Sequence, residues 1–224
     1  MKIVCIGNSI VNGFPLKRSQ CFTGLLRSRY GYETINKGVN GDTTDGIYER
    51  FDSDVTAHRP DVCLLLTGTN DFIGGKSAEQ AFDNIKRILA KAAQLDSMQM
   101  ILMTPLLTYP PMAERMWIPA DYTALNKTLE EFAQRLKSLE GCSIIDTQSA
   151  FKNCGIAAED AYSDGIHPTA EVHEFLAEYI AKQLEAVLKY KICRLFLPDF
   201  KSRFLSSPGL QTFKDQRLKA IVKK

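Results

Sequence analysis

Ser9, Asp164 and His167 have the side-chain types of a nucleophile, an orienting carboxylate and a general base. Serine is a weak nucleophile until a base removes its proton, and imidazole, with an ordinary pKa near 6.5, can do this at neutral pH. An aspartate three residues before a histidine can reach back to the imidazole Nδ1 and fix the tautomer. Two widely separated parts of the sequence therefore carry side chains suited to hydrolytic acyl transfer.

These side chains can act together only if the fold brings Ser9 next to Asp164 and His167. Short apolar runs predict strands at residues 2–6, 32–37, 61–67, 98–104 and 143–146. Helical spacing predicts helices near 19–30, over 81–89 and 125–139, and from about 169 to 189, with Ser77 and Gln80 as a capping box. Strands that alternate with helices imply βαβ units, so we expect an α/β domain with a central parallel sheet.

Three polar motifs directly follow predicted strands. Gly7-Asn8-Ser9-Ile10 follows the first strand, Asn40-Gly41-Asp42-Thr43 follows the second, and Gly68-Thr69-Asn70-Asp71 follows the continuously apolar run at 61–67. The working loops of a parallel sheet lie at the carboxyl ends of its strands. We therefore expect three segments that are distant in the sequence to meet at one edge of the sheet.

Together with Asp164-Gly165-Ile166-His167, these motifs form an ordered set of four between residues 7 and 167. The set resembles the SGNH hydrolases, the GDSL-type esterase and lipase superfamily. The resemblance implies a three-layer α/β/α sandwich of flavodoxin-like type with about five parallel strands. It also implies a serine esterase that uses Ser9, His167 and Asp164 and needs no metal or organic cofactor.

The same resemblance implies which groups stabilise the oxyanion formed from an attacked carbonyl. They are the backbone amides of Ser9 and Gly41 and the side-chain amide of Asn70. Glycine lets the backbone approach a ligand closely, and an amide side chain donates without changing charge. One position departs from the family pattern, because Asn8 stands where the family has aspartate. Asparagine keeps a carbonyl acceptor but loses the charge, which leaves open how the segment carrying Ser9 is tethered.

Each motif taken alone also has a purely structural interpretation. Ser9 could be a turn or N-cap serine, and Gly41 could precede a capped helix. Asn70-Asp71 could be a plain turn, and Asp164 to His167 could simply lead into a helix. The order of the four motifs and the pairing of Asp164 with His167 favour catalysis. His58 and His173 have no carboxylate at turn spacing, and we expect both to be structural or exposed.

The segment from Leu106 to Asp121 interrupts the alternation of strands and helices and contains Tyr109, Met112 and Trp117. It forms either a wall that contacts the substrate or a packed surface loop. We expect the substrates to be small acyl or acetyl esters, with lysophospholipid and thioester hydrolysis as alternatives within the family.

Two functions of other classes also fit part of the sequence. A flavodoxin-like sheet could bind a phosphate or a flavin at the loop after its first strand. A binding module without catalysis could likewise keep the fold. Neither function explains Asp164 and His167.

Length and composition suit one hydrolase domain over residues 1–190, since 224 residues with 45% hydrophobic content can bury a single core. No apolar run approaches the ~18 residues needed to span a bilayer, and the opening apolar run is too short for a signal peptide, so a cytoplasmic location is expected. The six cysteines form no C-x-x-C motif. Because Cys5, Cys63 and Cys142 fall in predicted strands, buried thiols are expected.

Residues 191–224 differ from the rest, with nine Lys or Arg residues against two Asp or Glu. Such a segment could bind polyanions, but charge runs are usually solvated, so we expect a basic appendage, natural or a non-native extension, and no nucleic-acid partner. Its apolar residues could instead dock on the domain or on a second subunit; they are Ile192, Leu195, Phe196, Leu197, Phe200 and Phe204.

Overall fold

The computed structural model describes the backbone of residues 1–95, 97–118 and 120–196, and side chains as far as residue 187. The chain divides into two units, Met1–Gln183 and Leu184–Lys224. The first unit contains all four motifs and every strand found in the described residues. The predicted tail falls in the second unit, and its apolar residues Leu197, Phe200 and Phe204 lie outside the described residues. The division at residue 190 therefore stays a prediction.

Strands and helices alternate along the chain, as the hydrophobic pattern predicts. The strands are β1 (Lys2–Gly7), β2 (Glu33–Gly38), β3 (Val62–Leu66), β4 (Gln99–Met103) and β5 (Ser143–Ile145). The helices are α1 (Ser9–Asn12), α2 (Phe22–Tyr30), α3 (Thr44–Asp54), α4 (Thr69–Ile73), α5 (Ala78–Ala92), α6 (Pro110–Met116), α7 (Tyr122–Lys137), α8 (Thr147–Lys152), α9 (Ala158–Ala161) and α10 (Ala170–Phe196), with one 3₁₀ turn at Thr56–His58.

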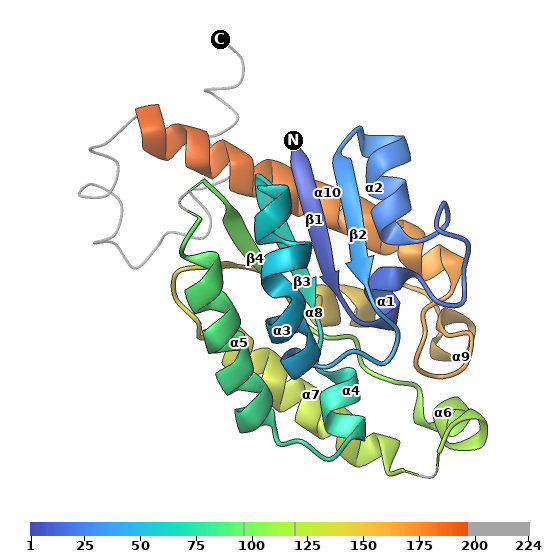
Figure 1. Ribbon diagram of the computed structural model, residues 1–224. Coiled ribbons are helices and arrows are strands. Elements are labelled where there is room, and N and C mark those ends of the chain that lie inside the picture. Colours follow the sequence, from blue (N-terminus) through green and yellow to red (C-terminus); the bar gives the residue numbers. More distant parts are fainter. Residues whose placement is uncertain (96, 119, 197–224) are drawn as a thin grey trace, which may run out of the picture. The chain divides into compact units, whose positions relative to one another are not determined.

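The five strands form one parallel sheet in the order β2-β1-β3-β4-β5 (Figure 1). Gly7, the last residue of β1, pairs with Gly38 of β2 on one side and Leu66 of β3 on the other. The chain changes direction across the sheet between β1 and β3, and sites in open α/β sheets form at the carboxyl edge of such a point. The predicted sheet and fold class are confirmed.

Both faces of the sheet are covered by helices, which makes three layers. Alternate residues of β1 point to opposite faces, so Val4 and Ile6 join a core with α3, α5 and α7, to which Ile47, Phe51, Ile85 and Phe132 also belong. Ile3 and Cys5 are buried against the other face. On that side the Phe22 ring at the start of α2 stacks on His173 of α10, which runs behind β1 and β2 in Figure 1.

Short helices replace loops at three places that matter for the site. α1 begins at Ser9 itself, α4 carries Asn70, and α6 lies within the segment expected to be irregular. Helices of four to seven residues are too short for an apolar periodicity to develop, which is why the sequence pattern does not reveal them. The predicted capping box of Ser77 and Gln80 is confirmed at the start of α5.

The free cysteines of the described part are Cys5, Cys21, Cys63, Cys142 and Cys154. Cys5 and Cys63 are fully buried in β1 and β3, and burial raises the pKa of both thiols. Cys142 precedes β5 by one residue and is half-buried, so its assignment to a strand was wrong. No helix in the described part of the chain has the length and apolar character needed to cross a membrane.

Candidate active site

Ser9, His167 and Asp164 form one continuous chain of hydrogen bonds. The Ser9 Oγ lies 2.8 Å from His167 Nε2, and His167 Nδ1 lies 2.7 Å from Asp164 Oδ2. All three residues are buried. Burial by itself raises the pKa of the Asp164 carboxyl, but hydrogen bonds from the His167 ring and from the amides of His167 and Ile166 outweigh it, so the pKa lies below its ordinary value. The Asp164 carboxyl is therefore ionised at neutral pH and can act as an anionic partner of the imidazole.

The turn from Asp164 to His167 is held by hydrogen bonds from its own backbone to the Asp164 carboxylate. Asp164 Oδ1 accepts hydrogen bonds from the amides of Ile166 at 3.0 Å and His167 at 2.8 Å, so one carboxylate orients both the turn and the ring. Gly165 has a φ of +86°, and an added Cβ would lie 2.3 Å from the Ala113 nitrogen of α6. Only glycine suits this position, because α6 packs directly against the turn.

Ser9 is the first residue of α1, and Asn8 is its N-cap. The Asn8 side-chain oxygen accepts a hydrogen bond from the Ile10 amide at 3.1 Å. Asparagine and aspartate are about equally good N-caps, so the missing charge leaves this tether intact. The departure of Asn8 from the family pattern is thereby explained.

The segments that carry Gly41 and Asn70 lie next to the one that carries Ser9, because β2, β1 and β3 are neighbours in the sheet. Asn12 of α1 donates to the Asn40 side chain at 2.7 Å, and Asn70 Nδ2 donates to the Asp42 carbonyl at 2.9 Å. Within the described residues, neither the Ser9 amide nor the Gly41 amide donates a hydrogen bond to another protein atom. Gly41 has a φ of +77° and open space where a Cβ would lie. These donors are free to bind a ligand oxygen.

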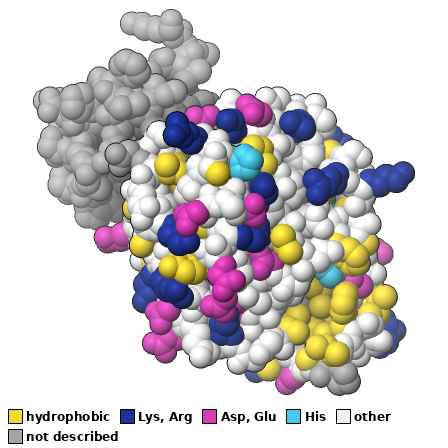
Figure 2. All heavy atoms as spheres, in the orientation of Figure 1, with side chains coloured by type: hydrophobic (Ala, Val, Ile, Leu, Met, Phe, Trp, Pro, Cys, Tyr) yellow, Lys and Arg dark blue, Asp and Glu magenta, His cyan; other side chains and the backbone are white. Residues whose placement is uncertain are grey.

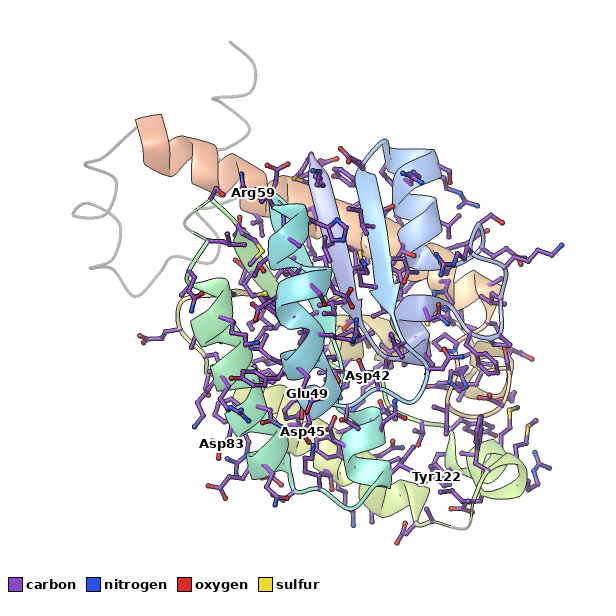
Figure 3. All side chains as sticks on the ribbon, viewed as in Figure 1. Asp42, Asp45, Glu49, Arg59, Asp83 and Tyr122 are labelled. Carbon is purple, nitrogen blue, oxygen red and sulfur yellow. The ribbon has the colours of Figure 1, made fainter. Side chains whose placement is uncertain are left out.

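Arg50 and Asp71 form hydrogen bonds that hold these segments together, and the motif analysis predicted neither set of contacts. Arg50 of α3 donates to the Asp42 carboxylate at 2.8 Å and to the carbonyls of Lys37 and Gly7 at 2.9 and 3.1 Å. Asp42 is labelled in Figure 3 near the start of α3. Asp71 accepts both the amide and the hydroxyl of Thr44, the first residue of α3. No local spacing signals these contacts, since each joins separate elements.

Two aromatic rings approach His167 from different segments. The Phe14 ring meets the imidazole edge-on with centroids 4.8 Å apart, and the Trp117 ring is tilted against it at 5.6 Å. Trp117 is one of the predicted substrate-contacting residues, whereas Phe14 was not predicted. Tyr109 and Met112 are half-buried, and the Tyr109 amide donates to the Gly165 carbonyl at 2.7 Å. The structure thus places α6 and Trp117 beside the base.

The other histidines lie apart from this hydrogen-bond chain. His173 is fully buried, and its Nδ1 accepts a hydrogen bond from the Phe22 amide at 3.1 Å. His58 ends the 3₁₀ turn and is half-buried. Within the described residues, no group of three or more His, Cys, Asp or Glu side chains is arranged to hold a metal ion.

Comparison with known proteins relates the chain to one family of hydrolases. The GDSL-like Lipase/Acylhydrolase family matches residues 5–175. Thioesterase 1/protease 1/lysophospholipase L1 of Escherichia coli (strain K12) is 22% identical over 193 residues, covering 84% of this chain and 85% of that protein. An acetylxylan esterase of Geobacillus stearothermophilus is 23% identical over 176 residues, covering 72% and 77%.

A solved structure has the same fold. It is a member of the lipolytic protein G-D-S-L family from Veillonella parvula, with a TM-score of 0.68 and 16% identity, covering 81% of this chain and 97% of that one. The family match spans most of the chain, including all four motifs. The chain therefore belongs to the GDSL-like lipase and acylhydrolase family, whose members hydrolyse carboxylic esters.

Proposed function

We propose that this protein is a serine esterase that hydrolyses small acyl or acetyl esters through an acyl-enzyme intermediate. The observation that carries the proposal is the hydrogen-bonded chain from Asp164 through His167 to Ser9, with distances of 2.7 and 2.8 Å. A binding module or flavin site would leave this chain of contacts without a function. The family membership supports ester hydrolysis as the reaction class.

In the proposed mechanism, Ser9 Oγ attacks the ester carbonyl carbon while His167 Nε2 takes the hydroxyl proton. The carbonyl oxygen becomes an oxyanion bound by the amides of Ser9 and Gly41 and by Asn70 Nδ2. The intermediate collapses when His167 returns the proton to the alcohol oxygen, which leaves Ser9 acylated. Water, deprotonated by His167, then releases the acid by the same steps.

The test is hydrolysis of p-nitrophenyl acetate and labelling by an organophosphonate, with mass spectrometry locating the modified residue. We expect one label, at Ser9, and we expect Ser9→Ala to abolish labelling and hydrolysis while the circular dichroism spectrum stays unchanged. Ser19→Ala is the matched control, because Ser19 is exposed in the same part of the chain. Labelling at another residue, or hydrolysis that survives in Ser9→Ala, would refute the assignment.

A panel of substrates identifies the acyl and alcohol groups that the protein prefers. The Escherichia coli relative is named a thioesterase and lysophospholipase, and the Geobacillus stearothermophilus relative an acetylxylan esterase. The panel therefore includes acetate esters, a sugar acetate, an acyl thioester and a lysophospholipid. We expect the small acetate esters to give the highest kcat/KM, and a higher value for the thioester or the lysophospholipid would replace the proposed substrate class.

A further inference from the structure

The surface beside His167 is unusually apolar. The Phe14 and Trp117 rings contact the imidazole, yet they are 38% and 40% exposed while His167 is buried. Next to Trp117 on the chain, Met116 and Ile118 are exposed as well. Figure 2 shows a broad hydrophobic area on the part of the surface where α6 lies in Figure 1. We name Phe14 and Trp117 the aromatic rim.

Hydrogen bonds fix the backbone of the residues that form the aromatic rim. The Phe14 amide donates to the Ser9 carbonyl at 3.1 Å, and the Trp117 amide donates to Ala113 at 3.0 Å. Tyr122, labelled in Figure 3 at the start of α7, is fully buried and its hydroxyl donates to the Ile118 carbonyl at 3.4 Å. Preorganised rings lose little conformational entropy when a ligand covers them.

The proposed mechanism assigns the two sides of the site to different parts of an ester. His167 Nε2 must return its proton to the oxygen of the departing alcohol, so that oxygen lies within hydrogen-bond distance of the imidazole. The carbonyl oxygen faces the donors of Ser9, Gly41 and Asn70 instead. Substituents on the alcohol oxygen therefore extend past the rings that flank His167, whereas the acyl group starts at the Ser9-bound carbon.

We propose that the aromatic rim is a subsite for the alcohol portion of the substrate and that it selects alcohols with an apolar ring, such as aryl or arylmethyl groups. This inference rests on the proposed function and names its substrate class. Indole and phenyl rings bind flat apolar groups by stacking and by burial of apolar surface. Both rim side chains present an apolar ring, which favours an apolar ring over a hydroxyl-bearing one.

The first experiment compares two acetates that differ only in the alcohol, ethyl acetate and benzyl acetate. We expect Trp117→Ala and Phe14→Ala each to lower the ratio of kcat/KM for benzyl acetate to kcat/KM for ethyl acetate about tenfold, mainly through KM for benzyl acetate. Trp117→Phe should restore most of the benzyl acetate activity. Tyr30→Ala is the matched control, because Tyr30 is an aromatic residue of α2 with 37% exposure.

Three outcomes of this comparison would overturn the inference. Equal loss with both acetates would mean that the rings only position His167. A loss that follows acyl length, in a series from ethyl acetate to ethyl butyrate, would place the acyl group on the rim. A larger loss with a sugar acetate than with benzyl acetate would make the rim a carbohydrate platform.

A second experiment needs no catalysis. Trp117 is the only tryptophan in the sequence, so its fluorescence reports on the rim. In the Ser9→Ala variant, benzyl acetate should change this fluorescence saturably, and ethyl acetate at equal concentration should not. Such binding without any Ser9-dependent hydrolysis would keep the subsite and refute the proposed function. Ser9-dependent hydrolysis without a fluorescence response to benzyl acetate would support the proposed function and refute the subsite.

Discussion

At the scale of the residue, the Asn70 amide has two hydrogens, and one of them donates to the Asp42 carbonyl at 2.9 Å. That bond fixes the direction of the second hydrogen, which is the one proposed to bind the oxyanion. Replacing Asn70 by alanine should lower kcat for p-nitrophenyl acetate by roughly 100 to 1000 fold with little change in KM, because the donor acts mainly in the transition state.

Steady-state kinetics of the purified variant provide the measurement for Asn70→Ala. Asn40→Ala is the control, since Asn40 lies in the neighbouring segment and is tied to Asn12 rather than assigned to the oxyanion. If KM rises while kcat is unchanged, Asn70 binds the ground state of the substrate instead.

Asn8 shows how a residue can depart from a motif without changing the site. The position needs an acceptor for the Ile10 amide, and the asparagine carbonyl provides one. The charge of an aspartate is not required for that contact. The position thus requires only a side-chain acceptor for the Ile10 amide, which asparagine and aspartate both supply.

At the scale of the element, Arg50 links the carboxyl ends of β1 and β2 to the segment before α3. Its side chain is 18% exposed, and that of its partner Asp42 is 10% exposed. Arg50→Met should lower the free energy of unfolding by about 2 to 4 kcal/mol, because it leaves Asp42 and the Gly7 and Lys37 carbonyls without this donor. It should also lower kcat, since the segments bearing Ser9 and Gly41 lose a common support.

Urea unfolding and esterase kinetics test Arg50→Met together. The exposed Arg135, paired with Glu131 on one face of α7, supplies the control substitution Arg135→Met. We expect that variant to stay within about 0.5 kcal/mol and to keep its activity. Unchanged stability and unchanged kcat in Arg50→Met would show that the segments are held by other contacts.

α2 and α10 are joined by His173, which caps the first amide of α2 at Phe22. Burial lowers the pKa of His173 to about 4, from an ordinary value of 6.5. The folded state thus binds its proton less readily than the unfolded state. Stability from the neutral ring is complete above about pH 6.5 and is lost as the pH falls toward 4, on the order of 3 kcal/mol in all.

Unfolding free energies measured between pH 4 and 7.5 check this prediction. His173→Gln keeps a side-chain acceptor that does not titrate, so its stability should depend less on pH in that window, although it starts lower at pH 7. His58→Gln, at a half-buried position outside the contact between α2 and α10, is the matched control. An equally steep pH dependence in His173→Gln would assign the effect to other groups.

Much of this fold could be predicted from the sequence, because five apolar runs and four polar motifs follow local rules. The strands, the sheet and the position of Ser9, Gly41 and Asn70 after neighbouring strands are confirmed. The helix caps that Asp71 and His173 provide could not be predicted, since each accepting side chain lies in a different element from the backbone amide that donates to it. Phe14 was missed because it belongs to no motif and meets His167 only in three dimensions.

At the scale of the whole molecule, the four motifs lie within the unit Met1–Gln183. The helix expected to end near residue 189 continues to Phe196. Removal of residues 195–224 should leave hydrolysis of a small soluble ester within about twofold of the full chain, because charged termini punctuated by Pro and Gly usually add few buried contacts.

Kinetics and size-exclusion chromatography of the full and shortened chains check this prediction. A loss of activity together with a loss of solubility or a changed oligomeric state would make the segment structural. In that case the apolar residues of the removed segment would be the first to substitute, namely Leu195, Phe196, Leu197, Phe200 and Phe204.

The contact between Ser9 and His167 joins residues 158 positions apart in the sequence. Synthesis runs from the N-terminus, so Ser9, the proposed nucleophile, leaves the ribosome early, and His167, the proposed base, leaves only after the five strands of the sheet have been made. In a nascent chain, Ser9 has no imidazole to accept its proton until the Asp164–His167 turn has been synthesised. Hydrolytic competence should thus appear late and abruptly during translation, and a chain that stops before residue 164 should be catalytically silent even if its first strands fold.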